Sequence, residues 1–367
     1  MAVPSSGELE LYGDIGTELG VAQSNVTLHG MSQTAGFTPP DAMSEFYGYD
    51  PTPPLTTSFN TVLYTGTSST QSITGVGFKP DLVWIKDRTI ANSHILTDSV
   101  RGTNKALVSN ATNGDITSTD FFTSFDSDGF TIPPNTGTQT NKSGDNYVAW
   151  CWKAGGSAVT NTAGTITSQV SANVAAGFSV VTCTATGGVD TIGHGLGVPP
   201  SVIIYKTRST TGNWSTYHQS LGNTRGVYLN LPSAVVTSTF FWNNTSPTSN
   251  VFTAYGSAGN THIAYCFAEK AGFSKFGSYT GNSSTQTIVT GFEPAFVLIK
   301  RTNAYGNWWI FDNKRGEKGL LPNLTNAEWS DFEVINLLGN GFELVTDNGE
   351  FNLSGSTYIY MAFANQF

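Results

Sequence analysis

Two aspartates beside a glycine are the first side chains whose spacing suggests chemistry. Asp126 and Asp128 precede Gly129, as in loops that bind calcium. No glutamate follows at the spacing that an EF-hand requires, and the turn recurs as Gly339-Asn340-Gly341 without either aspartate. We interpret the segment as a hairpin turn, with a calcium role as the lesser alternative, and predict no metal site.

Catalytic groups are equally weakly supported. Cleavage of a glycosidic bond needs two carboxyl groups at a defined separation. The carboxylates that could serve show no pairing in the sequence; they are Asp312, Glu343, Asp347 and Glu350. The five histidines have no metal-ligand spacing, and we interpret His194 and His262 as turn or core residues. We therefore predict no catalytic residue, no enzymatic activity and no cofactor, and keep a glycan depolymerase as the third hypothesis.

Three tryptophans are the candidate contact residues. Trp214 and the pair Trp308-Trp309 occupy the same place in two related segments, where a third segment has Ser93-His94. Exposed aromatic rings suit sugar faces and protein partners, which makes these residues candidates for a receptor or glycan contact. The alternative is that they belong to a buried strand. Both interpretations remain open on the sequence alone.

These residues lie within a unit that occurs three times. The segment at 147–152 returns at 262–267 and again at 358–363, each time after a small polar turn. Each copy also has a glycine-rich turn that ends in a proline, followed by an apolar strand. Tandem copies of one module usually serve binding or building rather than one catalytic centre.

The local pattern of each copy is that of antiparallel strands. Short β-branched and aromatic runs alternate with glycine, asparagine and serine turns, and Asp128-Gly129 and Asn340-Gly341 are strong hairpin signals. The segment at 147–152 is apolar on both faces, which fits a central strand with one face against a second sheet and the other covered by loops or a neighbour. We predict an all-β protein of three tandem antiparallel β-sandwich modules after a short, mostly irregular N-terminal arm with one or two short helices.

The predicted domain boundaries follow from the copies. They are an arm with a proline-rich spacer at 1–56, the first repeat at 57–156, a linker at 157–177, the second repeat at 178–271 and the third at 272–367. The arm is too short to bury its apolar residues alone, so we expect it to order against a partner. The apolar residues of this predicted docking arm are Leu9, Leu11, Ile15, Leu19, Met43, Phe46 and Tyr47.

Composition excludes several classes of function. Only 12% of the residues are charged, 40 are glycine, and the net charge is −9, so binding to a phosphate backbone is not expected. We expect no membrane insertion and no signal peptide, because no apolar stretch is long enough. The three cysteines fall on apolar strands, which predicts reduced, buried thiols and assembly in a reducing cytosol.

Two segments of the chain resemble known phage proteins. The N-terminal pattern looks like the start of many virion proteins of tailed bacteriophages; it comprises Pro4-Ser5-Ser6-Gly7, Leu9, Leu11, Asp14-Ile15, Glu18-Leu19-Gly20 and Met43-Ser44-Glu45-Phe46-Tyr47-Gly48. The repeats resemble an uncharacterised domain common in phages of marine bacteria; the matching segments include 80–86, 147–156, 193–197 and 296–302.

The resemblance implies a virion structural protein that is assembled in the host cytoplasm. It favours a tail fibre or adhesin that docks to other virion proteins through its arm and presents the modules to a host-surface glycan or protein. Viral appendages are symmetric, so a homo-oligomer is expected. The alternative is a capsid decoration or head-fibre protein that stabilises or ornaments the shell.

Overall fold

The computed structural model describes residues 57–134, 139–329, 334–345 and 349–365. Residues from Thr57 onward form one compact unit. The predicted arm and its short helices lie outside the described residues, and so do all of its proposed docking side chains: Leu9, Leu11, Ile15, Leu19, Met43, Phe46 and Tyr47.

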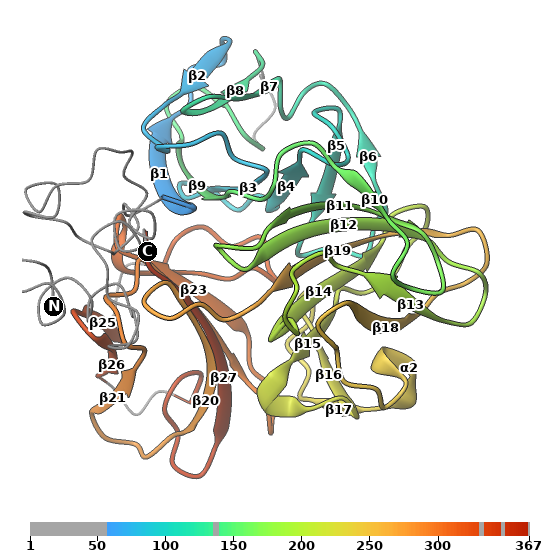
Figure 1. Cartoon of the computed structure of the whole chain (residues 1–367). Coiled ribbons are helices and arrows are strands. Elements are labelled where there is room, and N and C mark those ends of the chain that lie inside the picture. The colour runs from blue at the N-terminus through green and yellow to red at the C-terminus, as the bar shows by residue number, and fades with distance from the viewer. Residues whose placement is uncertain (1–56, 135–138, 330–333, 346–348, 366–367) are drawn as a thin grey trace, which may run out of the picture. The chain divides into compact units, whose positions relative to one another are not determined.

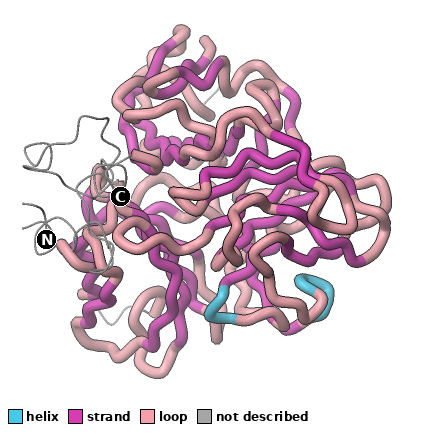
Figure 2. The backbone as a smooth tube through the Cα atoms, viewed as in Figure 1, coloured by secondary structure: helices cyan, strands magenta, loops and turns pink. Residues whose placement is uncertain are grey.

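The described chain is all-β, as predicted, with antiparallel pairing between its strands (Figures 1 and 2). Its helical residues are confined to the 3-10 turn η4 (Gln219–Leu221) and the short helix α2 (Thr239–Trp242).

Three large sheets share one strand order, in which the last strand of a repeat lies between its first strand and a second apolar strand. The first sheet has the order β1 (Phe59–Thr65), β9 (Asn146–Trp152), β3 (Leu82–Asp87), β4 (Ile95–Asp98), β5 (Lys105–Val108) and β6 (Ile116–Thr117). The second has the order β10 (Val159–Asn161), β11 (Ser168–Asn173), β12 (Phe178–Thr184), β19 (Thr261–Phe267), β14 (Val202–Thr207), β15 (Ser215–His218), β16 (Arg225–Tyr228) and β17 (Val236–Thr237). The third has the order β20 (Ser274–Thr280), β27 (Thr357–Phe363), β22 (Phe296–Arg301), β23 (Trp308–Asp312) and β24 (Gly316–Leu320).

Each large sheet is accompanied by a small one. The first small sheet contains β2 (Gln71–Ile73), β8 (Gly129–Ile132) and β7 (Ser124–Asp126). The second contains β13 (Val189–Gly193) and β18 (Val251–Tyr255), and the third contains β21 (Gln286–Val289), β26 (Gly341–Leu344) and β25 (Ile335–Leu338). The hairpins predicted at Asp126–Gly129 and Leu338–Gly341 are confirmed by the pairing of these residues.

The two apolar faces of β9 explain how the sheets pack. Val148, Trp150 and Trp152 point to a core shared by all three repeats. Alternate residues on the other face, among them Tyr147 and Cys151, belong to a separate core with the first small sheet. A central strand that is buried on both faces loses contact with water along its whole length, as its sequence predicted.

The three repeats meet in one shared apolar core. Trp152, Phe267 and Phe363 hold the same position on β9, β19 and β27, and their ring centroids lie 6.3, 5.9 and 5.6 Å apart in the three pairings. Each ring therefore contacts the other two. The expectation of modules standing in a row is wrong, because the inner face of each sheet can be buried only by the other two repeats.

The segment predicted as a linker, 157–177, is part of the second sheet. It contains β10 and β11, and β11 pairs with β12 along its whole length. Its alternating small polar residues resemble a loop in composition, whereas backbone pairing to an existing edge is what orders it.

Candidate functional site

The candidate contact tryptophans lie at the junctions between repeats. Trp214 is fully buried, and its indole N–H donates to the carbonyl oxygens of Val108 at 3.0 Å and Ala111 at 3.2 Å in the first repeat. The indole of Trp308 donates to the carbonyl of Tyr228 in the second repeat at 2.9 Å.

The first repeat makes the corresponding contact with a histidine. Trp84 donates to Nδ1 of His94 at 2.9 Å, so Nε2 carries the proton and donates to the carbonyl of Leu321 in the third repeat at 3.0 Å. Burial lowers the pKa of His94 well below its usual range, which keeps this ring neutral. The second repeat thus contacts the first, the third contacts the second, and the first contacts the third.

These positions do not support surface contact. Trp214, Trp308 and Trp309 are at most 4% exposed, so a glycan outside the protein does not reach them. Their place on buried strands is the alternative that the sequence left open, and the structure corrects the receptor-contact interpretation. The indole N–H groups of Trp214 and Trp308 fasten one repeat to the next.

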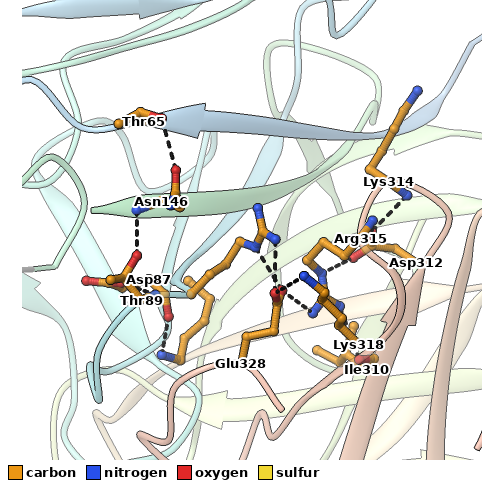
Figure 3. Close-up of polar contacts among 12 residues, drawn as sticks. Thr65, Asp87, Thr89, Asn146, Ile310, Asp312, Lys314, Arg315, Lys318 and Glu328 are labelled. Atoms are coloured by element: carbon orange, nitrogen blue, oxygen red, sulfur yellow. Dashed lines mark hydrogen bonds and ion pairs between the residues drawn. The ribbon is translucent and has the colours of Figure 1, made fainter. Parts of the chain in front are cut away.

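Ion pairs follow the same cyclic order at two junctions. Arg208 of the second repeat binds Asp115 of the first at 2.9 Å. Arg88 of the first repeat holds Glu328 of the third through two hydrogen bonds of 2.8 and 2.9 Å. Burial opposes ionisation of Glu328, yet its hydrogen bond to Arg88 and the charge of Arg315 lower its pKa. Figure 3 shows the carboxylate of Glu328 among the cationic side chains, including the labelled Arg315 and Lys318.

The third junction keeps the backbone contact and lacks the ion pair. Asp115 donates its N–H to the carbonyl of Arg208 at 2.7 Å, and Glu328 donates to Arg88 at 3.0 Å. At the corresponding place Val235 donates to Thr302 at 2.9 Å. Valine and threonine have no charge to pair there.

The acidic residues that could serve glycoside cleavage are engaged in the scaffold. The carboxylate of Asp312 is fully buried and accepts from Arg315 at 2.6 Å and from the indole of Trp150 at 2.9 Å. Glu350 accepts from the N–H of Asn307 at 2.8 Å. Glu343 accepts from Asn336 on the neighbouring strand, and Asp347 lies outside the described residues.

Three buried lysines end the equivalent strands β3, β14 and β22. Burial lowers the pKa of Lys86, Lys206 and Lys300 to about 8 in each case. The ammonium group of Lys206 donates to the carbonyl of Thr112 in the first repeat at 3.1 Å, and that of Lys300 reaches Pro232 in the second at 3.4 Å. Lys206 and Lys300 thus join neighbouring repeats rather than face an open site.

An open cleft of about 230 Å³ lies in the second repeat. It is lined mainly by aromatic and small polar side chains; these are Tyr205, Thr207, Gly212, Asn213, Ser215, Tyr228, Phe240, Phe241, Tyr255 and His262. We call this group the aromatic cleft. Concave sites with aromatic walls and a few polar groups are typical of small-ligand binding.

A difference between repeats accompanies the cleft. In the first repeat Tyr64 stacks on Tyr147 with ring centroids 5.1 Å apart, and in the third Tyr279 stacks on Tyr358 at 4.9 Å. The register of β12 and β19 puts Cys183 and His262 at these two positions in the second repeat. Two smaller side chains therefore replace a stacked tyrosine pair beside the cleft.

His262 is the ionisable residue in the cleft wall. Its ring stacks on Tyr205 with centroids 4.8 Å apart, and the residue is 5% exposed. Neither ring nitrogen has a hydrogen-bond partner in the described structure, and neither has the nearby hydroxyl of Thr207. Burial lowers the pKa of His262 to about 4, so the ring is neutral at neutral pH.

Two exposed rings form the rim of the cleft. Phe240 is 63% exposed and Tyr255 is 37% exposed, with ring centroids 4.4 Å apart. Phe240 lies in the first turn of α2, where the hydroxyl of Ser238 caps its backbone N–H at 3.1 Å. The cap fixes a large apolar side chain at the surface, away from any core.

A larger depression of about 500 Å³ on the same repeat is less suited to a ligand. Threonines form much of its wall, and its charged residue, Arg208, already pairs with Asp115. The aromatic cleft combines rings with unpartnered polar atoms, and we take it as the candidate site.

Searches for other site types give two findings. No group of three or more His, Cys, Asp or Glu residues in the described ranges could hold a metal ion. No helix in those same ranges is long and apolar enough to cross a membrane.

Comparison with known proteins places the chain in a family. The model of a domain of unknown function, DUF7483, matches residues 55–366. The chain belongs to the DUF7483 family. No curated protein and no solved structure matches it. The match begins two residues before the compact unit described above, so the DUF7483 domain comprises all three repeats together.

Sequence reasoning missed the aromatic cleft of the DUF7483 domain. It places His262 in a turn or core, and burial supports that, but the unpartnered nitrogens distinguish this residue from a satisfied core histidine. The available signal was the departure of Cys183 and His262 from the tyrosines of the other repeats. Phe240 and Tyr255 gave no signal, because single aromatic residues are ordinary at surfaces and in cores.

Proposed function

We propose that this DUF7483 protein is a non-enzymatic virion structural protein of a tailed bacteriophage that attaches the particle to the host surface. The observation that carries the proposal is the aromatic cleft, whose described lining residues include a neutral histidine and no carboxylate. Such a wall can recognise a ligand, whereas cleavage of a glycan needs an acid and a second carboxyl group or water-activating base.

The scaffold fits recognition by a rigid surface. Rings of all three repeats share one core, and hydrogen bonds join each repeat to the next. Side chains held by such packing lose little conformational entropy when a ligand binds, which favours affinity. In this proposal the segment at 1–56 docks to other virion proteins, the chain forms a homo-oligomer, and each repeat is a β-sandwich.

A decoration or head-fibre protein is the second candidate. The merging of three repeats into one compact unit favours it, because a unit stabilised from all sides suits a shell ornament as well as a fibre tip. Imaging of the particle with an antibody against the full chain separates the two, since label at the tail supports attachment and label on the capsid supports decoration.

A binding assay tests the attachment role itself. Fluorescent full-length chain should bind bacteria that the phage infects and should not bind resistant bacteria of the same species. Equal staining of both, or of neither, would refute a role in host attachment. Release of soluble sugar from host polysaccharide would instead support the depolymerase hypothesis.

A further inference from the structure

The cleft wall combines features that a sugar ring can satisfy together. The exposed faces of Phe240 and Tyr255 offer apolar surface against which the C–H faces of a pyranose stack. The cleft volume of about 230 Å³ lies below the range of drug-sized pockets and suits a single ring. An extended polymer would therefore place one residue in the cleft and leave its neighbours outside.

The unpartnered polar atoms specify the polar side of that ligand. The two nitrogens of His262 and the hydroxyl of Thr207 lie beneath the cleft surface without partners. A buried polar atom without a partner costs roughly 1 to 3 kcal/mol. A neutral imidazole has one donor and one acceptor, and a sugar hydroxyl can serve as the partner of either.

Charge narrows the ligand further. The described lining residues carry no lysine, arginine, aspartate or glutamate. A phosphate or an acidic sugar would lose hydration on entering and gain no opposite charge in return. A neutral sugar avoids that cost.

We propose that the aromatic cleft binds a neutral pyranose, stacked on Phe240 and Tyr255 and hydrogen-bonded to His262 and Thr207. This assignment rests on the attachment role proposed above and names the ligand class of its site. The sugar is a residue of a host-surface glycan, and the tyrosine pairs of the first and third repeats leave the second repeat as the one that carries this site in the described chain.

The test uses saturation-transfer NMR on the full-length chain with the methyl glycosides of glucose, galactose, mannose and N-acetylglucosamine. Wild type should show transfer to at least one of the four. Phe240→Ala should weaken that binding at least about tenfold, because it removes an exposed ring without disturbing a core. His262→Tyr should also abolish it, since tyrosine is the residue at this position in the other repeats.

A matched control and the opposing outcomes complete the design. Tyr305→Ala removes an exposed ring that does not line the cleft, and binding should be unchanged. The proposal falls if wild type shows no transfer from any of the four glycosides, or if Phe240→Ala binds as tightly as wild type. Loss in Tyr305→Ala as well would overturn it, because stacking would then be non-specific. Host-cell binding without sugar binding would leave attachment intact and refute the pyranose, with a peptide as the alternative occupant.

Discussion

Removing the indole nitrogen of Trp214 should destabilise all three repeats at once. In Trp214→Phe the carbonyls of Val108 and Ala111 lose a buried donor, which costs roughly 1 to 2 kcal/mol. The missing part of the fully buried ring adds roughly 1 to 2 kcal/mol of lost packing. We expect the free energy of unfolding to fall by about 2 to 4 kcal/mol.

Equilibrium unfolding in urea measures this change, followed by tryptophan fluorescence and by far-UV circular dichroism. Both probes should report the same transition, shifted to lower urea with an unchanged slope. The exposed control Tyr305→Phe should leave the midpoint where it is in wild type. A variant in which only part of the signal shifts would refute the reasoning, because the second repeat would then unfold independently of the others.

Three further predictions follow from burial and backbone geometry. Burial holds the pKa of His218 and of His262 near 4, whereas an unfolded histidine titrates near 6.5, so stability should be complete above pH 6.5 and fall as the pH drops toward 4. Urea midpoints across this range should show a shallower fall in His262→Tyr; an equal fall would contradict the assignment. Gly129 has φ +151° and an added methyl group would overlap the carbonyl oxygen of Ile73, so Gly129→Ala should cost more than about 1 kcal/mol by thermal unfolding. The control Gly144→Ala has open space around its Cβ and should cost less; the reverse order would refute the argument. The three buried thiols should resist a thiol reagent until urea unfolds the chain, and rapid labelling of the native protein would contradict their burial.

Local structure was predictable because its signals lie within a few residues. Asp128-Gly129 and Asn340-Gly341 require turns with positive φ, which Gly129 and Gly341 adopt at +151° and +154°. The exposed carboxylate of Asp128 also accepts from Gly75 and Gly77, at 3.1 and 2.6 Å. These hydrogen bonds lower its pKa and give this aspartate a structural role in the hairpin.

The arrangement of the repeats was not predictable for a physical reason. An apolar pattern on both faces of 147–152 shows that both faces are covered, but it does not say by what. A neighbour in the same chain and a second chain would leave the same sequence pattern. The contacts of Trp214 and Trp308 with other repeats span about a hundred residues or fewer of intervening chain, which no local pattern encodes.

The candidate site was missed because comparison between repeats, rather than residue type, reveals it. Tryptophan is the usual aromatic candidate for sugar contact, yet Trp214, Trp308 and Trp309 are buried at the junctions. The cleft instead depends on His262 in place of a tyrosine and on Phe240 held at the surface by a capped turn. A change from the repeat consensus is therefore the more informative signal in this chain.

Native-state hydrogen exchange on the full-length chain tests the shared core most directly. The amides of β9, β19 and β27 should exchange with the same opening free energy, within about 1 kcal/mol, because each strand loses its inner contacts only when the whole core opens. Three clearly different opening energies, one for each strand, would mean that the repeats fold separately and would contradict the account.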